Sequence, residues 1–214
     1  METRDNHAMK VAEFLLQVKA IELKPQNPFT WASGWKSPIY CDNRKTLSFP
    51  KVRTYLRQQF VATINQHFGK PDVIVGVATG GIAMGALVAE EMGLPFAYVR
   101  SSAKEHGLQN LVEGVIKPDQ NVVVIEDLVS TGKSSLNAVE ALREREVNVK
   151  GMVAIFTYGF DVAEENFAKA NVKLQTLTNY HLMLQKAEAH NYITDQQTAS
   201  LSTWREDPSS WSPN

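Results

Sequence analysis

The sequence lacks the features that define several large classes of protein. It contains a single cysteine, Cys41, which excludes an internal disulfide, and no second thiol or histidine pair accompanies it at zinc-ligand spacing. No apolar run approaches the roughly 20 residues that cross a bilayer. The first ten residues, METRDNHAMK, hold no apolar core of a secretory signal. We therefore expect no structural metal cage and no membrane partner, and we expect the cytoplasm as the location.

The sequence also lacks an excess of charge of one sign. Lys and Arg total 22 and Asp and Glu total 23, giving a net charge of −1, so no overall field attracts the phosphates of nucleic acid. Internal repeats and low-complexity tracts are absent as well. With 214 residues, 43% of them hydrophobic, the chain is long enough to bury a core as a single domain, residues 1–214. Any affinity for phosphate must therefore come from a local site.

The first third of the chain predicts two helices separated by short strands. Apolar residues from Val11 to Ile21 recur at spacings of three and four and predict an amphipathic helix that ends before Pro25. Residues 25–50 are rich in Pro, Gly, Ser and aromatic residues, which predicts short strands around a turn at residues 33–34. A second helix is expected over residues 50–68, with Ser48 as a candidate N-cap.

From residue 72 onward, strands and helices alternate. Strands are expected at residues 72–78, 96–100, 121–127 and 151–158, and helices at 82–93, 134–144 and 161–170, followed by an edge strand at 172–177, one or two helices within 179–206 and a poorly structured tail from Asp207. Residues 122–125 are apolar on both faces, as in a central parallel strand that helices cover on each side. The expected fold class is α/β, a doubly wound parallel sheet flanked by helices.

The end of the third of these strands carries the strongest chemical signal. In VVVIEDLVSTGKSS a buried strand ends at Glu126 and Asp127, and small residues then lead to Gly132, Lys133 and the next helix. Ligands of such sheets bind beyond the carboxyl ends of the strands, and helix N-termini favour anions. Backbone amides and hydroxyls of residues 129–134 can surround a phosphate, while the two acids can accept hydrogen bonds from vicinal hydroxyls of a sugar.

This segment has two other interpretations. Asp127 and Ser130 could simply cap a turn whose geometry needs Gly132. A nucleotide-binding P-loop needs glycine five positions before the Gly132–Lys133 pair, and Asp127 stands there, so that motif is excluded.

Two further segments are candidates for anion binding. After the first strand, Thr79, Gly80 and Gly81 present backbone amides without side-chain obstruction, although paired glycines before a helix more often mean close packing. The polar stretch after the second strand places Arg100, Lys104 and His106 within seven residues. On charge alone, a solvated loop is as good an interpretation of that stretch as a functional lid.

Two acids after an apolar strand, followed by a small-residue loop, are the pattern of the type I phosphoribosyltransferases, and the chain resembles that family. The resemblance implies that Glu126 and Asp127 hold the ribose hydroxyls of 5-phosphoribosyl 1-diphosphate, that the following loop holds its 5′-phosphate, and that the glycine turn cradles its diphosphate. The donor-binding residues implied in this way are Thr79, Gly80, Gly81, Arg100, Lys104, His106, Glu126, Asp127, Leu128, Val129, Ser130, Thr131, Gly132, Lys133 and Ser134.

Residues 100–107 are similar to the mobile loop of the orotate-specific branch of that family, and residues 29–44 resemble its N-terminal hood over the pyrimidine. The resemblance implies catalytic roles for Arg100, Lys104, His106 and Asp127, and orotate contacts for Ser130, Phe29 and Tyr40. It also implies a homodimer whose loops reach across to the partner's site. Within the single domain, residues 1–49 are then a helix and small N-terminal hood, and residues 194–214 a helix and tail.

The chain departs from one well-known bacterial form of this branch at Ala32, Gly80 and Ser101, where that form has lysines, and at Tyr158, near its arginine for the orotate carboxylate. The expected reaction is transfer of the phosphoribosyl group to orotate, giving orotidine 5′-monophosphate and diphosphate, with Mg²⁺ carried by the substrate. Two alternatives stay open: transfer to another nucleobase, and a non-catalytic regulator that senses the sugar diphosphate.

Overall fold

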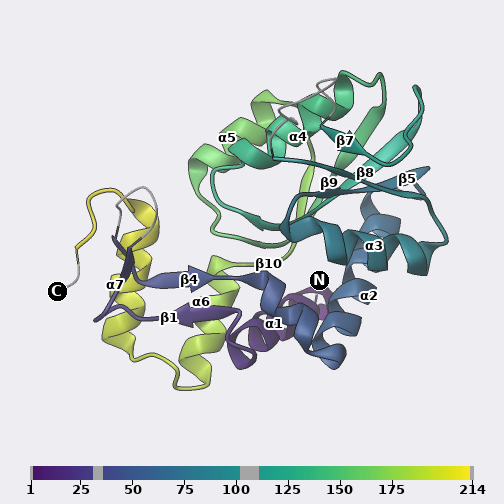
Figure 1. Cartoon of the computed structure of the whole chain (residues 1–214). Helices are drawn as coiled ribbons and strands as arrows, with labels where there is room; N and C mark the ends of the chain where they lie inside the picture. The colour runs from purple at the N-terminus through teal and green to yellow at the C-terminus, as the bar shows by residue number, and fades with distance from the viewer. Residues whose placement is uncertain (1, 31–35, 102–110, 213–214) are drawn as a thin grey trace.

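The computed structural model describes residues 2–30, 36–101 and 111–212, and its centre is a six-stranded sheet (Figure 1). The order across the sheet is β10 (Leu174–Asn179), β9 (Asn148–Thr157), β8 (Asn121–Val129), β5 (Val73–Val77), β6 (Phe96–Val99) and β7 (Val112–Glu113). All neighbouring pairs are parallel except β6 and β7. The expected doubly wound α/β fold is therefore confirmed.

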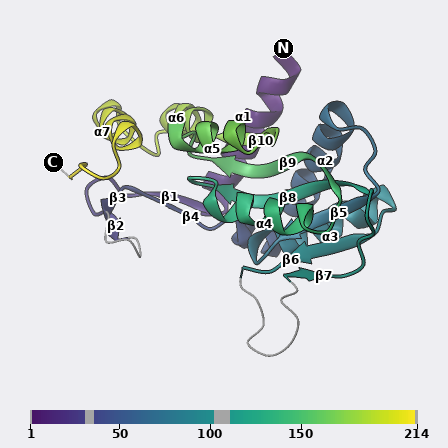
Figure 2. The same cartoon turned by 90° about the horizontal axis from the view of Figure 1, so that it is seen from above.

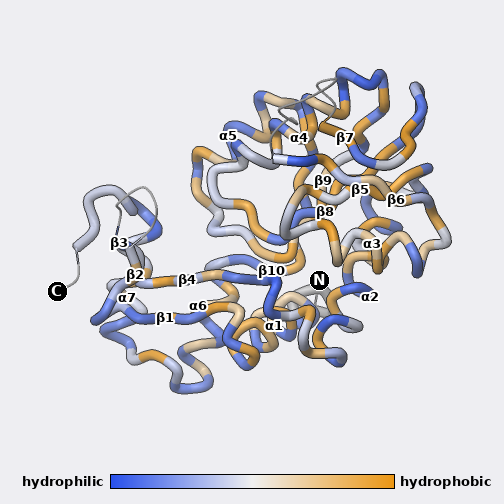
Figure 3. Tube along the Cα trace, viewed as in Figure 1, coloured by the Kyte–Doolittle hydropathy of each residue, from blue (hydrophilic) through white to orange (hydrophobic). Residues whose placement is uncertain are grey.

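Helices cover both faces of the sheet: Figure 1 shows α4 and α5 on one side of it and α2 and α3 on the other, and Figure 2 looks onto the face that α4 covers. On one face lie α1 (Glu2–Gln17), α2 (Pro50–His67) and α3 (Gly80–Met92); on the other lie α4 (Lys133–Arg143) and α5 (Asp161–Lys169). Each face buries its own hydrophobic cluster, the first around Leu56, Phe60 and Ile125 and the second around Val124, Val139 and Phe167. The inner strand β5 is correspondingly apolar along its length, and β8 is apolar from Val122 to Ile125, before its two acids (Figure 3).

The N-terminal segment forms two small ladders beside the main sheet. β1 (Ile21–Leu23) pairs antiparallel with β4 (Ile39–Cys41), and β2 (Phe29–Thr30) pairs antiparallel with β3 (Lys36–Ser37). The 3₁₀ helix η1 (Asn43–Ser48) then leads into α2. The expected short strands are thus present, and in Figure 1 they extend away from the main sheet together with α6 (Tyr180–Ala189) and α7 (Asp195–Glu206).

Several sequence-based boundaries are wrong. The first helix begins at Glu2 and ends at Gln17, and Ile21 lies in β1. Ile21 continues the helical spacing, but pairing with Cys41 buries it in a strand, so a tertiary contact overrides the local pattern. Ser48 does not cap α2: it ends η1, and Phe49 occupies the N-cap without a side-chain bond.

Two expectations about loops also change. The segment before β8 contains β7, which pairs antiparallel with β6 at the edge of the sheet. The start of the tail is ordered by Asp207, whose carboxylate accepts hydrogen bonds from the backbone and hydroxyl groups of Ser209 and Ser210. Those hydrogen bonds lower the pKa of Asp207 to about 2.

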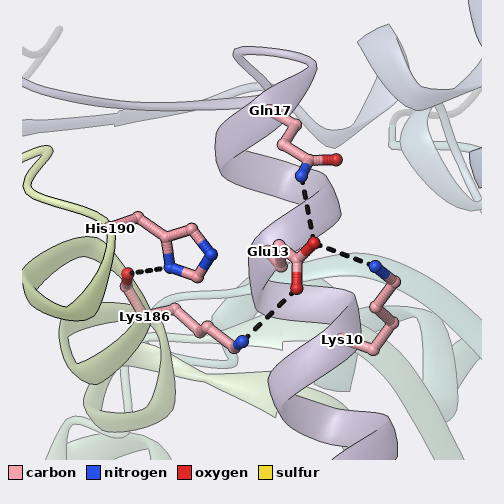
Figure 4. Close-up of polar contacts among 5 residues, drawn as sticks. All are labelled: Lys10, Glu13, Gln17, Lys186 and His190. Carbon is pink, nitrogen blue, oxygen red and sulfur yellow. Dashed lines mark hydrogen bonds and ion pairs between the residues drawn. The ribbon is translucent and has the colours of Figure 1, made fainter.

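A polar network fastens α1 to α6 (Figure 4). The carboxylate of Glu13 accepts hydrogen bonds from Lys10 at 2.9 Å and Gln17 at 3.0 Å within α1, and from Lys186 of α6 at 3.3 Å. The pKa of Glu13 lies below its ordinary value of 4.5, chiefly because of the hydrogen bond from Lys10. These bonds hold α6, from the C-terminal part of the chain, against the N-terminal helix α1.

Candidate active site

A pocket of about 460 Å³ lies where the strand order reverses, at the carboxyl ends of β5 and β8. β6 follows β5 on one side and β8 returns to its other side, so the loops after β5 and β8 diverge from a shared edge. Residues from both loops and from the N-terminal segment line the pocket: Cys41, Asp42, Arg44, Val77, Ala78, Thr79, Gly80, Glu126, Asp127, Leu128, Ser130, Thr131, Gly132, Lys133 and Ser134. Ten predicted donor-binding residues are therefore in one place.

At two glycines of the predicted site, the surrounding atoms leave no room for a side chain. A Cβ on Gly81 would lie 2.3 Å from the backbone oxygen of Ile125, so Gly81 lets α3 pack against β8. Gly132 adopts a left-handed φ of 80°, and a Cβ there would lie 2.7 Å from the ring of Phe167. Gly81 and Val129, which the resemblance also implied as donor-binding residues, do not line the pocket, and Val129 is fully buried.

Glu126 is held inside the wall. Only 5% of it is exposed, and its two oxygens accept hydrogen bonds from the Asp127 amide and the Ser135 hydroxyl, both at 2.9 Å. Burial, with the neighbouring Asp127 charge, raises the pKa of Glu126 well above its ordinary value of 4.5. Glu126 therefore stabilises the turn from within.

Asp127 faces the pocket beside the glycine turn. A Cβ on Gly80 would lie 2.2 Å from the Asp127 carboxyl carbon, so any side chain at residue 80 would displace that carboxyl group. The backbone oxygen of Asp127 accepts a 2.7 Å hydrogen bond from the buried side chain of Asn43. This bond fixes η1 to the end of β8.

The strand β8 continues two residues past the predicted end at Asp127, and the loop of residues 130–132 then leads into α4. Ser130 and Thr131 line the pocket ahead of α4 and Ser134 lines it from the first turn of that helix, where unpaired backbone N–H groups favour an anion. Asn166 of α5 donates a 3.0 Å hydrogen bond to the backbone oxygen of Thr131. Nothing in the sequence identified Asn166, because its partner is 35 residues away.

Arg100 lies on the other side of the glycine turn. With Thr79, Tyr98 and Glu113 it lines an adjoining pocket of about 550 Å³. Its Nη1 atom lies 3.6 Å from a Glu113 oxygen and, among the described residues, is buried without a hydrogen bond. A ligand oxygen at this point would satisfy that donor. Lys104 and His106, the other predicted cations of this segment, lie outside the described residues, as does Ala32.

The N-terminal segment contributes residues to the pocket other than the two aromatic residues that the resemblance implied. The rings of Phe29 and Tyr40 lie 5.3 Å apart and pair with each other, and neither lines the pocket. Cys41, Asp42 and Arg44 line it instead. Burial, then the charges of Asp127 and Asp42, raises the pKa of the Cys41 thiol well above 9.0, so the thiol is protonated and a poor nucleophile.

Tyr158 faces the protein interior. It is 3% exposed and contacts the rings of Phe156, Phe160, Tyr180 and Trp204. A larger cavity of about 780 Å³ lies between α5, β10, α6 and α7, and none of the predicted substrate-binding residues lines it. Because ten of the predicted donor-binding residues converge at the β5–β8 edge, we assign the chemistry to the smaller pocket.

Across residues 2–30, 36–101 and 111–212, no cluster of three or more His, Cys, Asp or Glu side chains could hold a metal ion. Nor is any helix in those ranges long and apolar enough to cross a bilayer.

Comparison with known proteins agrees with the geometry. A family model described as a phosphoribosyl transferase domain matches residues 56–179. The orotate phosphoribosyltransferase of Porphyromonas gingivalis is 56% identical over 201 residues, which cover 94% of this chain and 96% of that protein. The pocket residues from Val77 to Ser134 lie within the matched range, whereas Cys41, Asp42 and Arg44 precede it.

Two solved structures share the fold. The orotate phosphoribosyltransferase of Aeropyrum pernix has a TM-score of 0.75 at 26% identity, covering 86% of this chain and 99% of that one. The UMP synthase of Leishmania donovani has a TM-score of 0.78 at 26% identity, and the match covers 92% of this chain and 42% of that longer one.

Proposed function

The chain belongs to the orotate phosphoribosyltransferase family, and on that premise we propose how its pocket carries out the reaction. The reaction transfers the 5-phosphoribosyl group from 5-phosphoribosyl 1-diphosphate to orotate and yields orotidine 5′-monophosphate and diphosphate. The observation that carries the assignment of the site is the convergence of Asp127, the Thr79–Gly80 turn and the loop of residues 130–134 around one pocket.

We assign three parts of the donor to three parts of the wall. The 5′-phosphate binds the amides and hydroxyls of residues 130–134 at the N-terminus of α4. The ribose hydroxyls donate hydrogen bonds to Asp127, which Glu126 supports through its bond to the Asp127 amide. The diphosphate binds the turn at Thr79–Gly80 and extends toward Arg100.

The bond changes follow from this placement. The bond from the anomeric carbon to diphosphate breaks, the bond from that carbon to the pyrimidine nitrogen forms on the opposite face, and the ring passes through an oxocarbenium-like transition state. Asp127 stabilises the positive charge on the sugar, and Arg100, with Lys104 and His106, stabilises the departing diphosphate. The grip on the 5′-phosphate holds the anomeric carbon in place while the bonds change. The protonated Cys41 thiol takes no part as a nucleophile.

We propose that Mg²⁺ enters with the substrate. Carboxylate and phosphate oxygens are ligands that Mg²⁺ accepts while keeping several waters, so Asp127 and the substrate's own oxygens fit it. When bound, the ion supplies charge neutralisation at the diphosphate.

The wider assembly is also part of the proposal. Residues 100–107 resemble the family's mobile loop, which supports a homodimer in which each loop serves the partner's site. A single unpaired cysteine suits the reducing cytoplasm, where we place the enzyme.

The direct test incubates purified protein with orotate, 5-phosphoribosyl 1-diphosphate and Mg²⁺ and follows the loss of orotate absorbance. Parallel assays of diphosphate release replace orotate with uracil, adenine, guanine or hypoxanthine. Turnover with orotate alone is the expected result. Preference for another base would reassign the acceptor, and binding of the donor without turnover of any base would indicate a regulator.

A further inference from the structure

The acceptor in the proposed function carries a carboxylate, and a negative charge entering this pocket needs a positive partner. The described residues of the pocket wall include three acids, Asp42, Glu126 and Asp127, and two cations, Arg44 and Lys133. Lys133 is the first residue of α4, at the N-terminus assigned to the 5′-phosphate. Arg44 comes from the opposite wall, in η1.

The ion pair of Arg44 uses its Nε atom and leaves its two terminal guanidinium nitrogens available to a ligand. Its Nε atom lies 2.7 Å from Oδ1 of Asp42 in an ion pair, which orients the group. Among the described residues, its two terminal nitrogens donate no hydrogen bond, and 56% of the side chain is exposed. These two nitrogens form a planar fork that matches the spacing of carboxylate oxygens.

The backbone that carries Arg44 is fixed to the catalytic turn. The preceding residue, Asn43, is 1% exposed and donates its 2.7 Å hydrogen bond to the backbone oxygen of Asp127. The side chain of Thr46 also closes η1 by donating to the Asn43 backbone oxygen at 2.6 Å. Arg44 therefore projects from a segment held at a set distance from the acid that contacts the sugar, as a specificity-determining side chain requires.

We propose that Arg44 recognises the carboxylate of the pyrimidine acceptor through its terminal guanidinium nitrogens and so sets the preference for a carboxylated base. The assignment rests on the proposed function. It gives the carboxylate a partner in a chain where Tyr158 is buried among aromatic rings.

The test compares two nucleotides that differ by one carboxylate, orotidine 5′-monophosphate and uridine 5′-monophosphate. Isothermal titration calorimetry measures the dissociation constants of both for the wild type, Arg44→Ala and Arg44→Lys. Lys51→Ala, which removes one exposed positive charge from the first turn of α2, is the control. Thermal unfolding of each variant checks that the fold is retained.

We expect Arg44→Ala to weaken orotidine 5′-monophosphate at least about tenfold and to leave uridine 5′-monophosphate within about threefold, with Arg44→Lys in between because it keeps the charge and loses the fork. Lys51→Ala should leave both constants unchanged. Equal weakening of both nucleotides by Arg44→Ala, or no weakening of either, would overturn the assignment. A wild type that binds the two nucleotides equally would refute the proposed acceptor itself.

Discussion

At the scale of single residues, Glu126 and Asp127 are adjacent in the chain, and the fold gives their carboxyl groups different surroundings. Both line the pocket, but Glu126 is only 5% exposed and accepts hydrogen bonds from the Asp127 amide and the Ser135 hydroxyl, whereas the Asp127 carboxyl group lies beside Gly80. The alternation of side chains along β8 explains the difference, since consecutive side chains of a strand point to opposite faces of the sheet. We therefore assign sugar binding to Asp127 and structural support to Glu126.

Asp127→Asn should lower turnover at least about tenfold, which corresponds to about 1.4 kcal/mol in the activation barrier. The amide has the size of the carboxylate but lacks the negative charge that stabilises the sugar in the transition state. Steady-state kinetics with both substrates saturating measure the effect. Glu144→Gln, at the exposed end of α4, is the matched control and should behave like the wild type. Turnover of Asp127→Asn at the control's level would remove Asp127 from the mechanism.

The free energy of unfolding of Glu126→Gln, compared with that of the wild type, should increase as the pH rises. Because burial raises the pKa of Glu126 in the folded state, the folded state binds more protons than the unfolded state above the ordinary value of 4.5. The wild type then loses up to about 1.4 kcal/mol per pH unit between the unfolded and folded pKa values, and glutamine, which does not titrate, avoids that loss.

Urea unfolding of both proteins at pH 5 and pH 8 measures this difference. The advantage of the glutamine variant should be larger at pH 8. A difference that stays constant with pH would show that Glu126 ionises in the folded protein as it does in the unfolded one.

At the scale of elements, α7 connects parts of the molecule that lie far apart in the chain. The indole of Trp204 is fully buried and donates a hydrogen bond of 3.3 Å to the backbone oxygen of Lys36 in β3. Arg205 donates to the backbone oxygens of Tyr158 and Gly159, just after β9. The last helix thus holds the N-terminal ladders against the end of the main sheet.

Trp204→Phe should lower the free energy of unfolding by about 1–2 kcal/mol. The variant loses the bond to Lys36, worth about 1 kcal/mol, and leaves a small cavity among Tyr158, Phe160 and Tyr180. Denaturant unfolding measures it against Tyr192→Phe, an aromatic substitution at a residue that is 52% exposed. The control should shift stability by less than about 0.5 kcal/mol. Equal stability of the two variants would show that α7 contributes little to holding β3.

At the scale of the whole molecule, the site depends on the order of the strands and, in our proposal, on a second subunit. The reversal of order between β6 and β8 brings Thr79 and Asp127 to one edge, although 48 positions separate them. The predicted loop cations Lys104 and His106 complete that site from the partner in the proposed dimer.

Mixing Lys104→Ala subunits with Asp127→Asn subunits should restore activity. In a mixed dimer with shared sites, one site receives both substitutions and the other receives neither. Random exchange then recovers about a quarter of the wild-type activity, because half of the dimers are mixed and half of their sites are intact. Native mass spectrometry confirms the mixing. Mixed dimers without recovered activity would place each complete site within one subunit.

The alternation of apolar strands with helices determined the class of fold, because a strand covered on both faces must be apolar throughout, as residues 122–125 are. The sequence by itself also indicated that the acid pair and the loop after it belong to one pocket, since they lie within ten residues at the end of one strand.

The tertiary structure alone decided which of these groups reach the pocket. It buried most of Glu126 in the pocket wall, placed Arg44 on that wall, and put Ile21 in β1 although its spacing predicts a helix. The physical reason is the same in each case. A local pattern states which residues prefer burial or turns, whereas contacts between distant segments, such as Asn43 with Asp127 or Asn166 with Thr131, select the orientation.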